Sequence, residues 1–150
     1  MRVGLERPDL PDVVALIDAL DAYQKPLYPP ESHHGIDIAA LAQPNVVFAV
    51  MRDDGDRAIG CGAVVVERDY GELKRMYVDV AHRGGGRART LFLFLAGHAA
   101  ARGCARLMLE TGVRQPEALA FYTREGFVRC DPFGDYVEDP QSVFMVKALR

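Results

Sequence analysis

The chain has 150 residues, of which 49% are hydrophobic and 26% charged, and this balance excludes extensive disorder. A chain of this length can bury a core without disulfides or metal ions, and we predict a single domain over residues 1–150. The formal net charge of −3 excludes the global basic field that drives nonspecific nucleic-acid binding.

The first half of the chain shows helical patterns followed by strand patterns. Apolar residues recur at helical spacing from Val13 to Leu20, and prolines and polar residues then interrupt the pattern. The Asp54-Gly55 pair lies between two β-rich runs, which is a strong signal for an antiparallel hairpin. The expected elements are a helix over residues 10–22, a loop over 25–35, a short helix over 36–41, and strands over 46–50, 58–67 and 72–80.

Helices and strands alternate in the second half. A helix that ends at Gly103 carries on its expected core-facing side Leu91, Phe94, Leu95 and His98, the last interpreted as a structural histidine. The remaining elements are a strand over residues 106–111, a helix over 117–124, and strands over 127–130 and 143–146. This order predicts an α/β domain in which helices cover the faces of a mixed sheet.

Signals for export, membrane insertion and metal binding are missing. Residues 1–6 lack the apolar core of a signal peptide, and the longest apolar run, near residues 91–96, is too short to cross a bilayer. We therefore expect a cytoplasmic protein without a membrane partner. Cys61, Cys104 and Cys130 are widely spaced and form no C-x-x-C pair, so neither a disulfide framework nor a zinc site is predicted.

The stretch "HRGGGRARTL" (residues 82–91) places three consecutive glycines between a strand and a helix. Glycines leave backbone N–H groups free to converge, and the helix dipole adds positive potential at the same point. The arginines of the stretch would add to that potential. The arrangement predicts a loop that binds phosphate groups.

Two kinds of phosphate-binding loop can be compared with this stretch. A nucleoside-triphosphate loop requires Gly-Lys followed by Ser or Thr, which the stretch lacks. A dinucleotide loop would use Gly84-x-Gly86, with Glu110 as the ribose-binding acid. Against this alternative, Arg89 stands at the third glycine position, and the strand "ELKRMYVDV" is too polar for burial on both faces.

A third pattern of phosphate-binding loop matches residues 82–91 more closely than these two. Arg83-x-x-Gly86-x-Ala88 resembles the acyl-CoA signature of the GNAT N-acetyltransferases, R/Q-x-x-G-x-G/A. The surrounding "LKRMYVDVAHRGGGRARTL" is similar to the fourth strand, pyrophosphate loop and following helix of that family. Downstream, "LMLETGVRQPEALAFYTREGF" resembles its second motif, a strand followed by N-x-x-A-x-x-h-Y-x-x-x-G-F. The two motifs cover residues 72–127 in the family's order, and further likeness in "YPPESHH" indicates a small bacterial subgroup.

The resemblance implies the GNAT acyl-CoA N-acyltransferase fold, with a mixed, mostly antiparallel sheet flanked by helices. It implies acetyl transfer from acetyl-CoA to an amine by direct attack in a ternary complex, with no metal. The implied cofactor contacts are Met76, Val78 and Val80 for pantetheine, Arg83, Gly84, Gly85, Gly86, Arg87 and Ala88 for the pyrophosphate, and Gln115 and Tyr122. Gln115 departs from the family pattern, in which Asn is usual.

Three residues are candidates for proton transfer. Tyr122 stands at the family's tyrosine position and is the implied general acid for the departing thiolate, although helical spacing also permits a packed aromatic. An amine must lose a proton before it attacks, because its pKa is about 10. Glu72 is the predicted base, with a solvated strand-edge carboxylate as the alternative. Glu110 is a second candidate, which could instead only hold the following helix.

The resemblance also suggests where the acceptor binds. His33 and His34 lie in a loop that borders the acceptor pocket in this family, although paired histidines in polar loops are often merely exposed. Tyr136 is a third candidate for acceptor binding. The loop that contains Tyr136 carries acidic residues that would favour a cationic amine, namely Asp135, Glu138 and Asp139.

Other functions stay open at this point. A non-catalytic acyl-CoA-binding or regulatory module would keep the glycines and lose turnover. Nucleic-acid binding through the arginines would require a wider basic face with stacking aromatics, which this acidic chain lacks. The acceptor could be a small amine, an amino acid, an antibiotic or a protein terminus, and the family resemblance allows a homodimer.

Overall fold

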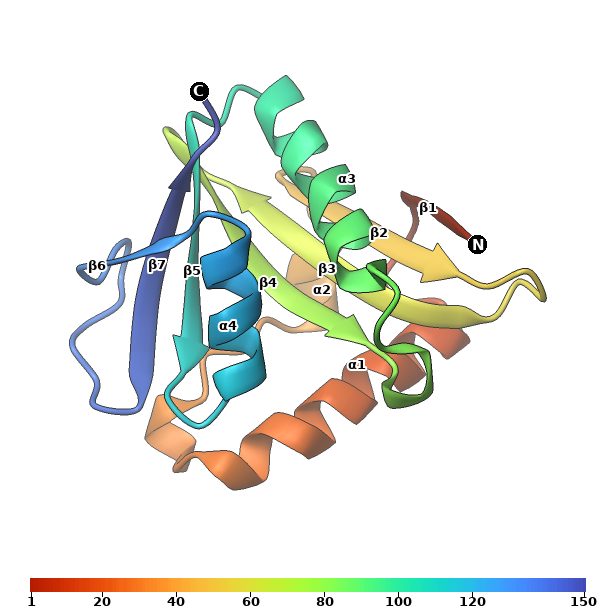
Figure 1. Cartoon of the computed structure of the whole chain (residues 1–150), viewed down its shortest axis with the longest axis horizontal. Coiled ribbons are helices and arrows are strands. Elements are labelled where there is room, and N and C mark those ends of the chain that lie inside the picture. Colours follow the sequence, from red (N-terminus) through yellow and green to blue (C-terminus); the bar gives the residue numbers. More distant parts are fainter.

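A seven-stranded sheet forms the centre of the computed structural model, which describes residues 1–150 (Figure 1). The strands are β1 (Arg2–Leu5), β2 (Val46–Arg52), β3 (Ala58–Val66), β4 (Tyr70–Val78), β5 (Arg106–Gly112), β6 (Val128–Cys130) and β7 (Ser142–Ala148). Their order is β1-β2-β3-β4-β5-β7-β6, and only the β4–β5 pair is parallel. The helices are α1 (Pro11–Gln24), α2 (Ile38–Leu41), α3 (Arg87–Ala101) and α4 (Pro116–Arg124), with 3-10 turns η1 (Lys25–Leu27), η2 (Pro30–Ser32) and η3 (Val80–His82). The predicted α/β class with a mostly antiparallel sheet is confirmed.

The two faces of the sheet bury separate hydrophobic cores, because successive side chains of a strand point in opposite directions. In β2, Val47, Ala49 and Met51 belong to the core that contains α3 residues. Phe48 and Val50 belong to the core that contains α1 residues. The sheet therefore separates α3 and α4 from α1 and α2 (Figure 1).

The N-terminal strand β1 is an element that the sequence pattern does not predict. Its four residues show no alternation of buried and exposed positions, since only the two central ones are half-buried. The strand exists because it pairs along the edge of β2, with Leu5 opposite Ala49 and Arg2 opposite Arg52. Pairing with a distant strand, rather than a local pattern, determines this element.

The buried face of α3 is rotated from its expected position. The prediction of Phe94 and His98 as core residues is wrong, because both are only half-buried and their rings lie 4.6 Å apart beside the core. The fully buried residues of the helix are Leu91, Phe92, Leu95 and Ala99. The rings of Phe121 and Phe127 contact Phe92 from the side of α4. Packing against α4 therefore selects Phe92 over Phe94.

Strands β4 and β5 separate soon after they meet. They pair over only three positions, from Tyr70 opposite Arg106 to Glu72 opposite Met108. Beyond this point their arrowheads point apart in Figure 1. The main-chain groups on this side of residues 73–78 consequently have no strand partner, and a gap opens in the middle of the sheet.

A β-bulge in β4 lies beside this gap. Two residues of β4, Arg75 and Met76, face the single residue Gly62 of β3. Arg75 has a φ of 57°, which is rare for a residue with a side chain. A Cβ at Gly62 would lie 2.6 Å from the Met76 sulfur and 2.7 Å from a Leu95 methyl carbon, so a side chain here would have to displace both groups. The bulge thus combines one residue with a strained backbone and one glycine that two side chains cover.

Neither disulfides nor membrane-spanning helices occur in the fold. The thiols of Cys61, Cys104 and Cys130 are free. Burial raises the pKa of the Cys61 thiol to about 12, so this thiol is protonated at neutral pH. None of the helices has the length and apolarity needed to cross a bilayer.

Candidate active site

The glycine loop, residues 83–88, joins the end of β4 to the start of α3. Gly84, Gly85 and Gly86 have φ values of 91°, 62° and 76°, a left-handed run that side chains would disfavour. The N–H groups of these glycines and of Ala88 make no hydrogen bond within the chain. Free N–H groups at the N-terminus of a 15-residue helix fit an anionic group such as a pyrophosphate.

The arginines around the glycine loop have different roles. Arg87 donates to the carbonyl oxygens of His82 (3.2 Å) and Gly84 (3.4 Å), so it satisfies acceptors of the loop and leaves the loop's donors free. Arg83 donates from Nε to the Val78 carbonyl at 3.0 Å. Arg89 does not reinforce the loop as expected, because its guanidinium is paired with Glu125.

The predicted pantetheine contacts lie along the open side of β4. The Met76 side chain packs toward α3, where it fills the space beside Gly62. Val78 is buried and ends the strand, whereas Val80 is 67% exposed in η3. The side chains of these residues do not line the gap as a set. Any contact with an extended ligand along β4 would therefore use main-chain groups.

Tyr122 and Gln115 both belong to the α4 segment but face different surroundings. The ring of Tyr122 is buried against Phe121 and Phe127, and its hydroxyl has no hydrogen-bond partner in the chain. Burial raises the pKa of Tyr122, which keeps the phenol neutral and able to donate a proton. Gln115 instead accepts a hydrogen bond from the Tyr28 hydroxyl at 3.1 Å.

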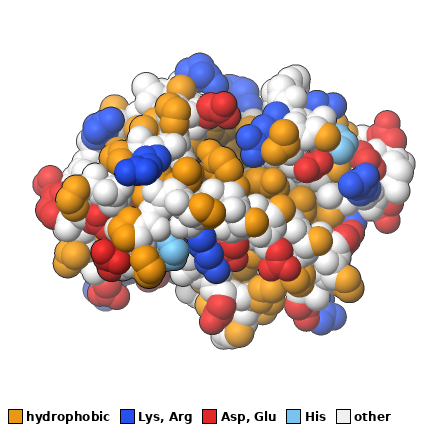
Figure 2. Space-filling view, turned by 90° about the horizontal axis from the view of Figure 1, so that it is seen from below, with side chains coloured by type: hydrophobic (Ala, Val, Ile, Leu, Met, Phe, Trp, Pro, Cys, Tyr) orange, Lys and Arg blue, Asp and Glu red, His pale blue; other side chains and the backbone are white.

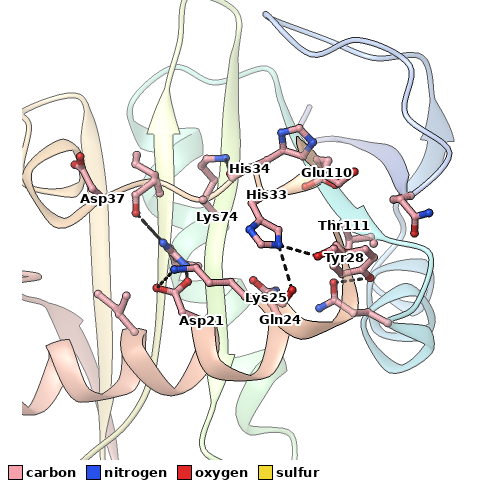
Figure 3. Close-up of a pocket in the computed structure, with 18 of the residues that line it drawn as sticks. Asp21, Gln24, Lys25, Tyr28, His33, His34, Asp37, Lys74, Glu110 and Thr111 are labelled. Carbon is pink, nitrogen blue, oxygen red and sulfur yellow. Dashed lines mark hydrogen bonds and ion pairs between the residues drawn. The ribbon is translucent and has the colours of Figure 1, made fainter. Parts of the chain in front are cut away.

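A polar cavity of about 490 Å³ opens on the face of the sheet that carries α1 (Figure 3). Its walls come from α1, from the segment that follows α1, from β4 and from β5. Only five of its 21 lining residues are hydrophobic, so it suits a small polar ligand.

On the molecular surface seen in Figure 2, acidic and basic side chains are interspersed, and neither sign of charge forms a separate patch.

Both candidate histidines line the polar cavity. The Nε2 atom of His33 lies 3.1 Å from the Lys25 carbonyl oxygen and 3.0 Å from that of Tyr28, so it donates within its own loop. His34 packs edge-on against Tyr136 and directs Nε2 toward Asp139, 3.8 Å away. This buried Nε2 atom makes no hydrogen bond.

Glu72 lies outside the lining of the polar cavity. Its carboxylate accepts a hydrogen bond from the Tyr136 hydroxyl (2.5 Å) and pairs with Lys74 (3.3 Å). Lys74 also donates to the Tyr136 hydroxyl and to the His34 carbonyl, each at 2.9 Å. Burial and the Glu72 carboxylate both raise the pKa of Tyr136. Glu72 and Tyr136 thus form a paired cluster with Lys74.

Glu110 lines the polar cavity directly. It lies on β5 two residues beyond Met108, the last residue that pairs with β4. No cation lies within ion-pair distance of its carboxylate, and burial raises its pKa above the ordinary carboxyl range. A half-buried carboxylate without a cation partner, at the mouth of the gap, can accept a proton from an amine bound beside it.

None of the three acidic residues predicted from the loop between β6 and β7 lines the polar cavity. Asp135 and Glu138 are exposed and do not line the polar cavity. Asp139 accepts a hydrogen bond from Ser32 at 2.7 Å. The hydrogen bond from the Gln141 N–H, together with the one from Ser32, lowers the pKa of Asp139. Asp139 therefore ties the cavity wall to the loop rather than facing the ligand space.

Two residues that the sequence analysis missed connect the walls of the polar cavity. Tyr28 packs on Gly112, where a Cβ would lie 1.7 Å from its hydroxyl, and it accepts the Arg114 N–H at 3.1 Å. Arg75 pairs with Asp21 at 2.5 Å and donates to the Ile36 carbonyl. The prolines after Tyr28 predict a loop but not the partner of Tyr28. The family resemblance implies a bulge in this strand, but no residue pattern places it at Arg75.

Comparison with known proteins agrees with this geometry. The model of the acetyltransferase (GNAT) family matches residues 14–127. An IAA acetyltransferase of Azospirillum brasilense is 43% identical over 149 residues, 98% of this chain and 97% of that protein. YsnE of Bacillus subtilis, an uncharacterised N-acetyltransferase, is 39% identical over 124 residues, 81% of this chain and 82% of that protein.

Solved structures share the fold. A crystal structure assigned to an acyl-CoA N-acyltransferase of Klebsiella pneumoniae is 36% identical with a TM-score of 0.85, covering 99% of this chain and 97% of that one. An aminoglycoside 6'-N-acetyltransferase in complex with coenzyme A has a TM-score of 0.75 at 16% identity, covering 100% of this chain and 98% of that one. The chain is therefore an acetyl-CoA-dependent acyltransferase that belongs to the acetyltransferase (GNAT) family.

Proposed function

We propose that the protein transfers an acetyl group from acetyl-CoA to a small polar amine by direct attack in a ternary complex. One observation supports this proposal above the others. The polar cavity is lined by β4 and β5 residues that follow the last paired positions of the two strands. An acceptor in the cavity would therefore lie beside a donor bound along the open side of β4.

The glycine loop fits the pyrophosphate of coenzyme A, because its N–H groups are free and its bare glycines leave the backbone accessible. The open main chain of β4, including Met76 and Val78, would hold the pantetheine arm as an added strand does. When bound, acetyl-CoA supplies the acetyl thioester. A main-chain N–H near Val78 would stabilise negative charge on the carbonyl oxygen.

Two side chains would move protons. Tyr122 would act as the general acid, since its phenol is neutral and has no partner in the chain. Glu110 would act as the general base, since it faces the polar cavity without a cation partner. Glu72, the base predicted from the sequence, is held by Tyr136 and Lys74 outside the cavity, so we assign it to positioning Lys74.

Initial-rate kinetics test this proposal. The release of free thiol would be followed while acetyl-CoA and an acceptor are varied together, over a panel of acceptors that includes small amines, amino acids, aminoglycosides and IAA. IAA belongs in the panel because the 43% identical relative is named for it. A ternary complex gives intersecting double-reciprocal lines. Parallel lines with an isolable acetyl-protein would contradict direct attack.

The non-catalytic alternative has a distinct result in the same assay. A binding module would take up acetyl-CoA and release no thiol with any amine of the panel. None of the three cysteines lines the polar cavity, which also favours direct attack over a cysteine-bound intermediate.

A further inference from the structure

The charges that line the polar cavity are unevenly satisfied. Each of its lysine and arginine residues already has a carboxylate partner. The Lys74 ammonium lies 3.3 Å from Glu72, and Arg75 lies 2.5 Å from Asp21. Lys25 is the weakest case, with its ammonium 3.9 Å from Asp21. No cation of the lining is therefore left without a carboxylate.

Three carboxylates of the lining, by contrast, have no cation partner. Asp18 makes no hydrogen bond or ion pair, and Asp37 only accepts the N–H of Ala40 (2.8 Å) as a helix cap. Glu110 is the third. The cavity lining therefore carries carboxylates that no lysine or arginine neutralises. His33 and His34 would offset this negative charge only when protonated.

These carboxylates are placed at two ends of the polar cavity. Figure 3 shows Asp37 and Asp21 at one end and Glu110 and Thr111 at the other. Asp18 lies on α1 one helical turn before Asp21. Glu110 is at the end nearest the gap between β4 and β5, where the amine to be acetylated would lose its proton.

We infer that the acceptor is a small diamine, whose second ammonium group binds at the Asp18 and Asp37 end of the polar cavity while the first meets Glu110. The inference rests on the proposed function. A carboxylate at the distal end of the acceptor would meet two like charges there, and an alkyl end would gain no charge contact. A second cation complements the carboxylates at both ends.

Matched acceptors test the inference. The probes are α,ω-diamines, ω-amino acids and n-alkylamines with chains of three to six carbons, which differ only in the distal group. We expect kcat/KM for the best diamine to exceed that of its alkylamine by about threefold to tenfold, because each exposed carboxylate contributes modestly. The ω-amino acid should be the poorest of each set. Raising the salt concentration should reduce the diamine preference, since these charges are exposed.

A charge-neutral variant locates the effect. Asp18→Asn should lower the diamine preference, the ratio of kcat/KM for the diamine to kcat/KM for its alkylamine, by about threefold. Asp69→Asn is the control, because Asp69 is exposed in the turn between β3 and β4 and does not line the cavity. It should leave the preference intact.

The outcomes separate the inference from the proposed function. Acetylation of alkylamines or ω-amino acids at rates equal to or above those of diamines overturns the inference alone. An unchanged diamine preference in Asp18→Asn also overturns it. Absence of thiol release with every amine overturns the proposed function and the inference together.

Discussion

The glycine loop and the polar cavity both adjoin β4, yet they are built in opposite ways. The loop presents main-chain N–H groups from consecutive residues, and its arginine side chains bind carbonyls or another helix. The cavity presents side chains from α1, β4, β5 and the segment after α1. Main-chain donors can hold an anionic group whatever the neighbouring side chains are, whereas the cavity can change its ligand by exchanging single side chains.

The largest expected effect tests the base at the polar cavity. Glu110→Gln should lower kcat/KM about 100-fold or more, because general-base catalysis is lost, and should abolish the acidic limb of the pH profile. That limb should lie above the ordinary carboxyl range, because burial raises the pKa of Glu110. Initial rates from pH 5 to 9 measure it.

Glu72→Gln is the matched control. It should reduce kcat/KM less than tenfold and retain the acidic limb, because Glu72 lies outside the cavity lining. If Glu72→Gln removed the acidic limb and Glu110→Gln retained it, Glu72 and not Glu110 would be the general base.

The same Glu110 variant has an expected effect on stability. The folded wild-type carboxyl holds its proton to higher pH than the unfolded one, so its free energy of unfolding falls as pH rises through that interval. Glu110→Gln lacks this loss and should be more stable at pH 8 by an amount on the order of 1 kcal/mol. Urea unfolding at pH 5 and pH 8 compares the two proteins. A stability difference that does not shrink at pH 5 would contradict burial as its cause.

Tyr122→Phe tests the acid on the other side of the gap. Loss of the hydroxyl should lower kcat by about tenfold to 100-fold and leave the affinity for acetyl-CoA unchanged, since the ring stays packed against Phe127. Tyr23→Phe, at an exposed residue of α1, is the control. If Tyr122→Phe kept the full kcat across the pH range, Tyr122 would not be the general acid and would serve only as a packed aromatic residue.

A methyl group tests how far the glycine loop depends on backbone geometry. At Gly86 an added Cβ meets nothing within 4 Å, but φ is 76°, so Gly86→Ala strains the backbone without a clash. We expect the Kd for acetyl-CoA to rise about fivefold. Gly97→Ala also adds a methyl group in open space but within α3, and should leave the Kd unchanged. Equal Kd values for both variants would contradict a left-handed requirement at Gly86.

The smallest effect concerns the bulge that separates the loop from the cavity. Both Arg75→Ala and Arg75→Gly lose the contacts with Asp21 and Ile36. Glycine also relieves the strain of a φ of 57°, so Arg75→Gly should be more stable than Arg75→Ala by about 1 kcal/mol. Urea unfolding measures the difference. Alanine is usually more stable than glycine within a strand. If Arg75→Ala were the more stable variant here too, the bulge would not be strained.

The contrast between the two regions also explains what the sequence could predict. The glycine loop was predictable because its residues are consecutive and lie between a strand and a helix. The strands and helices were largely predictable from periodicity, except for the edge strand β1, which depends on pairing with β2. The buried side of α3 was misjudged because α4, and not the helix itself, selects Phe92.

The polar cavity was less predictable because its contacts join distant segments. Tyr28 meets Gln115 across 87 positions, and Ser32 meets Asp139 across 107. The sequence placed His33 and His34 at this site, and both line it. It favoured Glu72 over Glu110 as the base, although Glu110 lines the cavity and Glu72 is held outside it by Lys74 and Tyr136. No local pattern encodes that difference.

Calorimetric titration with acetyl-CoA tests most directly the claim that the glycine loop holds the donor. Gly86→Glu serves as the site variant, since it places a carboxylate beside the free N–H groups, and NAD is the control ligand. The account predicts binding of acetyl-CoA by the wild-type protein, loss of that binding in Gly86→Glu, and no heat with NAD. Binding of NAD in place of acetyl-CoA, or undiminished acetyl-CoA binding in the variant, would contradict it.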